Sequence, residues 1–236
     1  MPAKEMAWPI QQSDRQWVKP EGDDPRTLYQ MLMVSQKMFG NEPCFGFIPS
    51  PGMARIHLTY NEFGDLSTAM AKGLRDIGVE KGDRVAIILD NSVEWAALSY
   101  GANAIGAAYT AMYTHQHGKD WAYILEDATP KVVAVQSTEV LDKLCGALAD
   151  DAWPASGVIL LGDEPANQLP PKGVEVRTWT EMVQAGRSAD DLAEIADDPS
   201  ALSTLIYTSG TTGNPKGVML SNWNTLSNVL CVQGVF

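Results

Sequence analysis

The chain has 236 residues, of which 45% are hydrophobic and 19% are charged, and its formal net charge is −12. This balance is typical of a globular protein with its own core and excludes a disordered or collagen-like chain. The acidic surplus argues against a nucleic-acid partner, because a phosphate backbone is bound through clustered Lys and Arg, but it leaves a nucleotide ligand open.

The cysteines and the N-terminus bear on the cellular compartment. Cys44, Cys145 and Cys231 are far apart and lack the spacing of a metal site. The first 24 residues contain no apolar signal-peptide core. We therefore expect reduced thiols in a cytoplasmic chain. Peripheral association with an intracellular membrane stays open.

The first predicted elements are a helix and a β-hairpin, after an N-terminal extension over residues 1–26. Asp24 suits a helix cap, Pro25 the first helical position and Gly40 the end. Two short apolar runs, 44–48 and 54–58, flank a Pro- and Gly-rich turn and predict the hairpin. The helical face is expected to consist of Leu28, Met31, Leu32, Ser35, Met38 and Phe39.

Helix and strand signals alternate from residue 59 onward. Thr59 and Glu62 form a capping box before a helix that ends at Gly78. Its apolar face is expected to contain Phe63, Leu66, Met70, Leu74 and Ile77. The continuous apolar run 84–89 is typical of a strand buried on both faces of a parallel sheet. Asn91 and Glu94 are predicted to begin the next helix.

The same alternation continues toward the middle of the chain. Further strands are expected at 109–113, 131–135 and 157–161, with helices near 119–127 and 138–149. This βαβ pattern predicts an α/β fold with a mostly parallel sheet layered with helices.

Residues 95–113 carry no charge for 19 residues, which is nearly enough to span a bilayer. However, the stretch contains Ser99, Asn103 and Thr110 and few large apolar side chains. We interpret it as a small-residue helix packed closely on the sheet, followed by a buried strand.

Residues 139–198 contain thirteen acidic and four basic residues, which we interpret as a solvated surface with a loop at 165–172. The adjacent pairs Asp190–Asp191 and Asp197–Asp198 do not face a common point, so a paired-carboxylate catalytic site is the minor alternative. A metal site at His115 and His117 would need a third ligand, and His57 is the one remaining histidine, so a surface loop is favoured.

The stretch YTSGTTGNPKGVMLS, residues 207–221, follows the predicted strand 202–207. Its glycines and hydroxyl groups could cradle a phosphate, and Lys216 supplies a cation for a terminal phosphate. It is not a Walker A loop, and no G-x-G-x-x-G occurs. A long flexible turn is the alternative. Residues 218–220 then predict a short strand, and Ser221 a helix cap.

This stretch resembles, over its whole length, the phosphate-loop signature of the adenylate-forming (AMP-binding) enzymes. Three further segments, 58–63, 78–95 and 106–135, resemble successive blocks of that superfamily. The long-chain acyl-CoA synthetases are resembled most in 78–95, through NSVEW, and in GNPKGVMLS at 213–221. The resemblance covers residues 27–236. It implies the N-terminal part of the large domain of the adenylate-forming fold, divided into a first α/β subdomain, 27–196, and the start of the next, 197–236.

The resemblance also implies an acid–thiol ligase. Such enzymes activate a carboxylic acid, here a fatty acid, with ATP and Mg²⁺ to an acyl-adenylate, and coenzyme A then takes the acyl group. Thr211 and Thr212 would help to orient the metal. The residues implied in holding the phosphates are Thr208, Ser209, Gly210, Thr211, Thr212, Gly213, Asn214, Pro215, Lys216 and Gly217.

Relatives continue with an acyl pocket, an adenine site, a metal-binding acid and a C-terminal domain with the catalytic lysine. None of these lies before residue 236, so no catalytic residue is assigned, and we expect the N-terminal part of such an enzyme. The alternatives are a truncated, non-catalytic nucleotide-binding fragment, a partner of a separate chain, or an aryl-acid ligase. An exposed face of the last helix would favour self-association through Leu226, Val229, Leu230 and Phe236.

Overall fold

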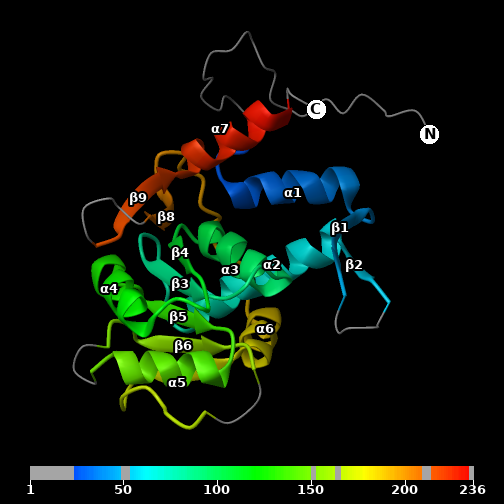
Figure 1. The fold of residues 1–236 in the computed structure, drawn as a ribbon. Coiled ribbons are helices and arrows are strands. Elements are labelled where there is room, and N and C mark those ends of the chain that lie inside the picture. The colour runs from blue at the N-terminus through cyan, green and yellow to red at the C-terminus, as the bar shows by residue number, and fades with distance from the viewer. Residues whose placement is uncertain (1–23, 49–53, 150–152, 163–165, 209–213, 234–236) are drawn as a thin grey trace.

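The predicted βαβ alternation is present in a computed structural model, which describes residues 24–48, 54–149, 153–162, 166–208 and 214–233 (Figure 1). The helices are α1 Leu28–Phe39, α2 Tyr60–Asp76, α3 Val93–Ala104, α4 Gly118–Ala128, α5 Thr138–Ala147, α6 Trp179–Ser188 and α7 Asn222–Gln233. The strands are β1 Pro43–Phe47, β2 Ile56–Thr59, β3 Arg84–Ile88, β4 Ala108–Met112, β5 Val132–Val135, β6 Gly157–Leu160, β7 Glu175–Thr178, β8 Leu202–Thr208 and β9 Lys216–Ser221.

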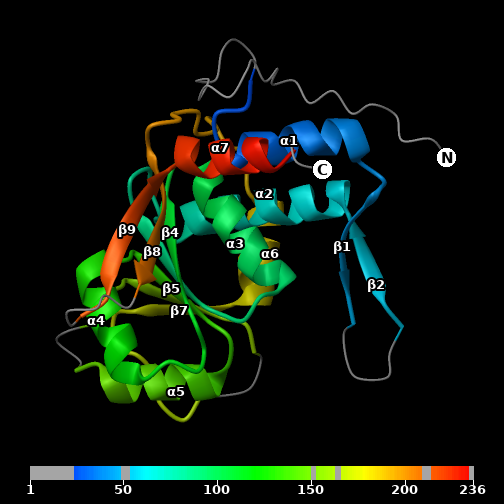
Figure 2. The same cartoon turned by 45° about the horizontal axis from the view of Figure 1, so that its top comes forward.

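The main sheet has seven strands in the order β7-β6-β5-β3-β4-β8-β9. Every neighbouring pair is parallel except β8 and β9, which are antiparallel. The mostly parallel α/β sheet expected from the sequence is therefore confirmed. The expected hairpin is also present, because β1 and β2 pair antiparallel, and it projects from the body beside the start of α2 (Figure 2).

Side chains of β3 alternate between two cores, one on each face of the sheet. Val85 and Ile87 pack in the core formed with α1, α2, α3 and α6, whereas Ala86 and Ile88 pack in the core formed with α4 and α5. Because both faces are covered, β3 is apolar at consecutive positions. The predicted strand buried on both faces is confirmed.

The uncharged stretch forms α3, which packs tightly on α2. A Cβ at Gly101 would lie 3.0 Å from the Ala71 nitrogen and 3.1 Å from the Ser67 oxygen, so the two backbones approach closely. The interpretation as a small-residue helix followed by a strand is confirmed. In the described part of the chain, no helix combines the length and apolarity needed to cross a bilayer.

Two predicted helix starts are wrong by one to three residues. The cap of α1 is Thr27, whose Oγ1 accepts a 3.2 Å hydrogen bond from the Gln30 nitrogen, and not Asp24. The cap of α3 is Ser92, whose Oγ accepts from the Trp95 nitrogen, and not Asn91. In both cases the hydroxyl residue directly precedes the first helical residue, where its oxygen reaches the free N–H groups.

The core face of α1 also differs from the expected one. Tyr29 is buried, and its hydroxyl shares a 2.7 Å hydrogen bond with the hydroxyl of Thr68, whereas Met38 is 42% exposed.

The predicted capping box of Thr59 and Glu62 is confirmed at the start of α2.

The acidic segment contains two elements that the sequence interpretation missed, β7 and α6. Thr178 and Glu181 form a capping box, and Met182 and Val183 of α6 are buried. The interpretation of this segment as solvated surface is therefore wrong for these residues. The T-x-x-E pattern that identified the start of α2 was present here as well.

The last helix packs on the body. The predicted cap is confirmed, since Ser221 Oγ accepts from the Asn224 nitrogen. Leu226 is fully buried, and α7 lies beside α1 (Figures 1 and 2). The expectation of an exposed Leu226 is wrong, because α7 packs against β8, β9 and α1. The side chains of Leu230 and Phe236 lie outside the described residues.

The sheet runs on through the predicted subdomain boundary. Ala196 donates a 2.9 Å backbone hydrogen bond to Ala104, and β8 pairs with β4 shortly afterwards. The division into 27–196 and 197–236 stays a prediction.

Candidate phosphate-binding site

The predicted phosphate-binding stretch connects the antiparallel strands β8 and β9. Tyr207 pairs with Gly217, and Thr208 pairs with Lys216. Because residues directly opposite each other in a ladder share a face, the hydroxyl of Thr208 and the ammonium of Lys216 belong to the same side of the ribbon. Five of the predicted residues, 209–213, lie outside the described ranges. The metal-orienting role of Thr211 and Thr212 therefore stays a prediction.

The described residues of the stretch face solvent. Thr208, Asn214, Lys216 and Gly217 are exposed, and Pro215 is half-buried. No ion pair among the described residues involves Lys216. Its ammonium is therefore available to an anion at the point where β9 begins.

The stretch lies at the carboxyl edge of the parallel sheet. It follows β8, which runs parallel to β4, and α3 and α4 leave β3 and β4 toward opposite faces. In open α/β sheets, ligands bind beyond the carboxyl ends of the strands, near the point where the helices that follow two neighbouring strands pass to opposite faces of the sheet. The geometry therefore puts the predicted stretch on the ligand-binding edge.

A polar cluster that the sequence interpretation missed occupies the same edge. Thr114 donates a 2.7 Å hydrogen bond to Asp90 Oδ1, and Gln136 Nε2 donates to Asp90 Oδ2 at 3.3 Å. The Asp90 nitrogen donates to Gln136 Oε1 at 2.6 Å. The sequence signal was a polar residue shortly after each apolar strand. This cluster ties together the ends of β3, β4 and β5.

The strand before the stretch is attached to α4. The Tyr207 hydroxyl donates a 2.6 Å hydrogen bond to Asp127 Oδ2. Partial burial of the ring raises the pKa of the Tyr207 phenol, and the Asp127 carboxylate raises it further. The phenol therefore stays protonated and acts as a donor at neutral pH.

The histidines do not form a metal site. His115 and His117 are exposed on the loop before α4, and the ring of His115 stacks on Tyr113 at 5.4 Å between centroids. His57 lies on β2, which Figures 1 and 2 show on the opposite side of the molecule from α4. The ranges described above contain no group of three His, Cys, Asp or Glu placed to hold a metal ion. The prediction of a surface loop is confirmed.

The adjacent aspartates are engaged separately. Asp191 accepts a 2.8 Å hydrogen bond from the Lys72 ammonium, which holds the pKa of that carboxyl below its usual range. Asp198 accepts from the Ser200 nitrogen at 2.8 Å. Asp191 and Asp198 therefore have different partners.

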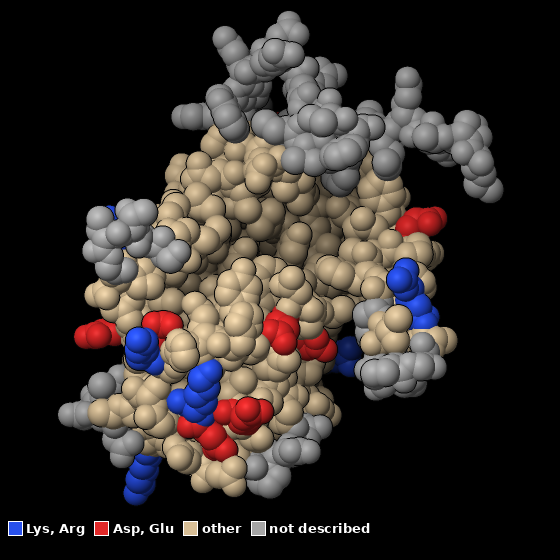
Figure 3. Space-filling model, viewed as in Figure 1, with Lys and Arg blue, Asp and Glu red and all other residues tan. Residues whose placement is uncertain are grey.

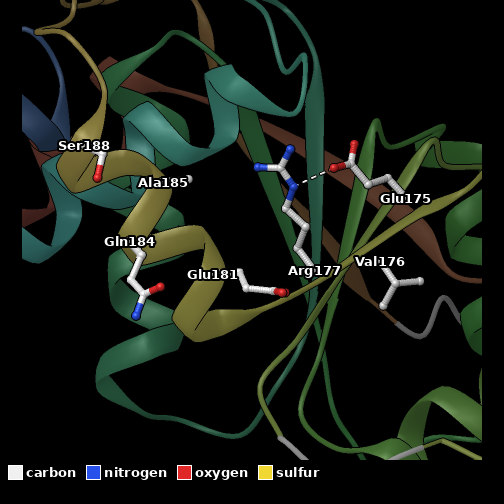
Figure 4. A pocket seen from close by; sticks show the side chains of 7 residues that line it. All are labelled: Glu175, Val176, Arg177, Glu181, Gln184, Ala185 and Ser188. Atoms are coloured by element: carbon white, nitrogen blue, oxygen red, sulfur yellow. Dashed lines mark hydrogen bonds and ion pairs between the residues drawn. The ribbon is translucent and has the colours of Figure 1, made fainter.

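Among the described residues, two cavities lie away from the predicted phosphate-binding stretch. One, of about 500 Å³, lies between β7 and α6 and includes Glu175, Arg177 and Glu181 (Figure 4). There the Arg177 guanidinium lies 2.5 Å from a carboxylate oxygen of Glu175 and 2.5 Å from one of Asp76. The hydrogen bond to Asp76 contributes most to raising the pKa of Arg177. The other, of about 620 Å³, lies between α1 and residues 195–197. Because β7 and β9 are the opposite edges of the sheet, the first cavity is far from Lys216.

One face of the molecule carries few charges around β8, β9, α7 and α1. In Figure 3 the coloured Lys, Arg, Asp and Glu atoms gather on the lower part of this face, and the upper centre is hollowed and almost entirely tan. Ile206 and Val218, which pair across the ribbon, are 46% and 45% exposed. They share the ribbon face with Thr208 and Lys216, so an apolar surface adjoins the cation.

Comparison with known proteins extends these observations. The profile of a family described as AMP-binding enzyme matches residues 35–235. The long-chain-fatty-acid–CoA ligase ACSBG1 of Rattus norvegicus is 32% identical over 204 residues, which are 85% of this chain and 27% of that protein. The long-chain-fatty-acid–CoA ligase ACSBG2 of Homo sapiens is 28% identical over 210 residues, 87% of this chain and 30% of that protein.

Solved structures share the fold. The fatty acyl CoA synthetase of Mycobacterium tuberculosis superposes with a TM-score of 0.61 and 26% identity, over 84% of this chain and 35% of that one. ATP-bound MatB from Rhodopseudomonas palustris superposes with a TM-score of 0.64 and 26% identity. The match covers 88% of this chain and 37% of the MatB chain. The chain thus spans between a quarter and two fifths of the length of these relatives.

Proposed function

Because this chain belongs to the AMP-binding enzyme family, we propose that it is the polyphosphate-binding part of an acid–thiol ligase that activates a long-chain fatty acid with ATP and transfers the acyl group to coenzyme A. In the first step a carboxylate oxygen attacks the α-phosphorus of ATP and pyrophosphate leaves. In the second step the thiol of coenzyme A attacks the acyl carbon and AMP leaves. The names of the curated relatives support the fatty-acid class.

The observation that carries the proposal is the exposed Lys216 opposite Thr208, at the carboxyl edge of a parallel sheet. Two anions, carboxylate and triphosphate, must approach each other before the first bond forms. A fixed cation and hydroxyl donors lower the repulsion between them and stabilise the charge on the departing pyrophosphate. Lys216 and Thr208 would contact the β- and γ-phosphates.

Magnesium enters this proposal as part of MgATP. Magnesium retains several waters and is usually held by substrate phosphates plus one or two carboxylates. The described residues offer a threonine hydroxyl beside Lys216 but no convergent carboxylates, so their donor set fits an ion held mainly by the triphosphate. When bound, the ion would neutralise phosphate charge. We keep Thr211 and Thr212 as the proposed hydroxyl donors.

Binding of MgATP to the 236-residue chain, measured by calorimetry, is the direct test. We expect saturable binding that Lys216→Ala abolishes. Lys172→Ala, which removes an exposed lysine from the loop before β7, is the matched control and should bind as the wild type does. Absence of MgATP binding to the wild-type chain, or equal binding by Lys216→Ala, would contradict the phosphate-binding role.

Pyrophosphate–ATP exchange with a panel of acids separates the remaining alternatives. Exchange that requires a fatty acid supports adenylation by this chain, and exchange that requires an aromatic acid identifies an aryl-acid ligase. MgATP binding without exchange leaves a nucleotide-binding part whose chemistry depends on further residues. Flotation with phospholipid vesicles, in parallel, tests peripheral membrane association.

A further inference from the structure

The contact between Tyr207 and Asp127 joins two distant parts of the chain beside the phosphate-binding stretch. Tyr207 is the last residue but one of β8, and Asp127 lies in the last turn of α4, 80 residues earlier. Their 2.6 Å hydrogen bond is a short, charge-assisted one. It connects β8, the strand that enters the stretch, to α4, a helix on the sheet face that α4 and α5 cover.

Gly217 extends the same contact to the strand that leaves the stretch. Gly217 is paired with Tyr207, and a Cβ at Gly217 would lie 3.0 Å from Cζ of the Tyr207 ring and 3.2 Å from its hydroxyl oxygen. The ring therefore lies directly over the Gly217 backbone. A larger residue at 217 would displace the ring from its position toward Asp127. One aromatic side chain thus contacts β9 while it is bonded to α4.

Local structure does not account for an aspartate at position 127. A carboxylate in the last turn of a helix faces the negative end of the helix dipole, which is unfavourable. α4 ends at Ala128, and the carbonyls of Ala128 and Thr129 already accept hydrogen bonds from Arg84. What Asp127 gains in this position is its tertiary hydrogen bond to Tyr207.

We propose that Tyr207 and Asp127 are positioning residues, through which helix α4 holds Thr208 and Lys216 at the spacing that binds polyphosphate. This role rests on the proposed function, because it matters only if Lys216 binds phosphate. Neither residue touches the ligand. They fix the two strand ends from which the ligand-binding groups extend, one residue beyond the Tyr207–Gly217 pair on each strand.

The test combines nucleotide affinity with amide hydrogen exchange in the 236-residue chain. Tyr207→Phe deletes the donor and keeps the ring over Gly217. We expect MgATP affinity to fall roughly three- to fivefold, which corresponds to the loss of one hydrogen bond. We also expect faster amide exchange in residues 214–218, without nucleotide, and unchanged exchange in β3 and β5.

Two further variants distinguish the hydrogen bond from general damage. Asp127→Asn keeps an acceptor oxygen and should retain most of the affinity, whereas Asp127→Ala should match Tyr207→Phe. Because the two residues act as one contact, the double variant should lose no more than either single one. Tyr113→Phe, which deletes a hydroxyl from a residue that is 66% exposed, is the matched control and should change neither readout.

The outcomes separate the two proposals. A wild-type chain that binds no MgATP overturns the proposed function and the positioning role with it. Wild-type binding that is lost in Lys216→Ala but unchanged in Tyr207→Phe overturns the positioning role alone. Exchange that rises equally in β3, β5 and β9 would also overturn it, because it would show a general loss of stability.

Discussion

Asn103 and Ser203 form a reciprocal buried pair, 100 residues apart. Ser203 Oγ donates a 2.8 Å hydrogen bond to Asn103 Oδ1, and Asn103 Nδ2 donates to the Ser203 carbonyl oxygen at 3.1 Å. The same amide nitrogen donates to the Ala107 carbonyl at 3.2 Å. The side chains of Asn103 and Ser203 are almost completely buried. This pair attaches α3 to β8, the strand that leads to the predicted phosphate-binding stretch.

Replacing Asn103 should therefore destabilise the fold well beyond an ordinary polar substitution. Asn103→Ala leaves the Ser203 hydroxyl and two carbonyl oxygens buried without this partner, which we expect to lower the free energy of unfolding by about 2 to 3 kcal/mol. Urea denaturation followed by circular dichroism measures the change. Asn91→Ala, on an exposed residue, is the control and should shift stability by less than about 0.5 kcal/mol. Equal stability of the two variants would refute the structural role of the pair.

Gly186 should not accept a side chain. A Cβ at this position of α6 would lie 1.8 Å from the Ala69 carbonyl oxygen of α2, so Gly186→Ala must separate the two helices. We expect a loss of about 2 to 3 kcal/mol in the free energy of unfolding. Gly146→Ala provides a control of opposite sign, because that position of α5 is open. It should gain about 0.5 to 1 kcal/mol from helix propensity. Similar effects of both variants would mean that α2 and α6 are not in close contact.

The two capping boxes should contribute similar amounts to the free energy of unfolding. Thr59→Ala and Thr178→Ala each remove the side chain that accepts a backbone hydrogen bond at the start of a helix, at 3.2 Å in both cases. We expect each to lower the free energy of unfolding by about 1 kcal/mol. Thermal denaturation of the two variants checks this, with Thr59→Ser and Thr178→Ser as controls that keep the hydroxyl. A variant at 178 that leaves stability unchanged would count against α6 as a capped helix.

The same capping boxes predict that the free energy of unfolding falls as the pH is lowered below the ordinary pKa of their glutamates. Hydrogen bonds from Thr59 and Thr178 hold the pKa values of Glu62 and Glu181 below the ordinary 4.5. The carboxylates are thus more acidic in the folded chain than in the unfolded one. Their stabilisation is present above the ordinary pKa and is lost as pH falls through the lower folded-state pKa.

Urea midpoints measured from pH 6 down to pH 3 test this expectation. The double variant Glu62→Gln and Glu181→Gln should show a smaller decline in stability between pH 5 and pH 3 than the wild type. An unchanged decline would mean that other carboxylates account for the acid sensitivity, of which Asp142 and Asp191 are the first to replace.

The sequence by itself determined the elements whose signals are local. The T-x-x-E capping box at Thr59 acts within one helical turn, and the apolar run of β3 reflects burial on both faces, so both could be predicted from neighbouring residues. The stretch that we propose to bind phosphate was recognisable as a family signature for the same reason, because its glycines, hydroxyl groups and lysine are contiguous. Its position at the carboxyl edge of the sheet, by contrast, depends on the parallel pairing of β8 with the distant strand β4.

Only the tertiary structure decided which distant residues meet. The burial of Leu226, the pairing of Asn103 with Ser203 and the bond between Tyr207 and Asp127 each depend on the order of strands in the sheet. Such contacts join residues many positions apart, and their free energy arises from burial and hydrogen-bond geometry that no local spacing encodes. Even α6, with a local signal at Thr178, becomes part of the core only because α2 provides the surface on which α6 packs.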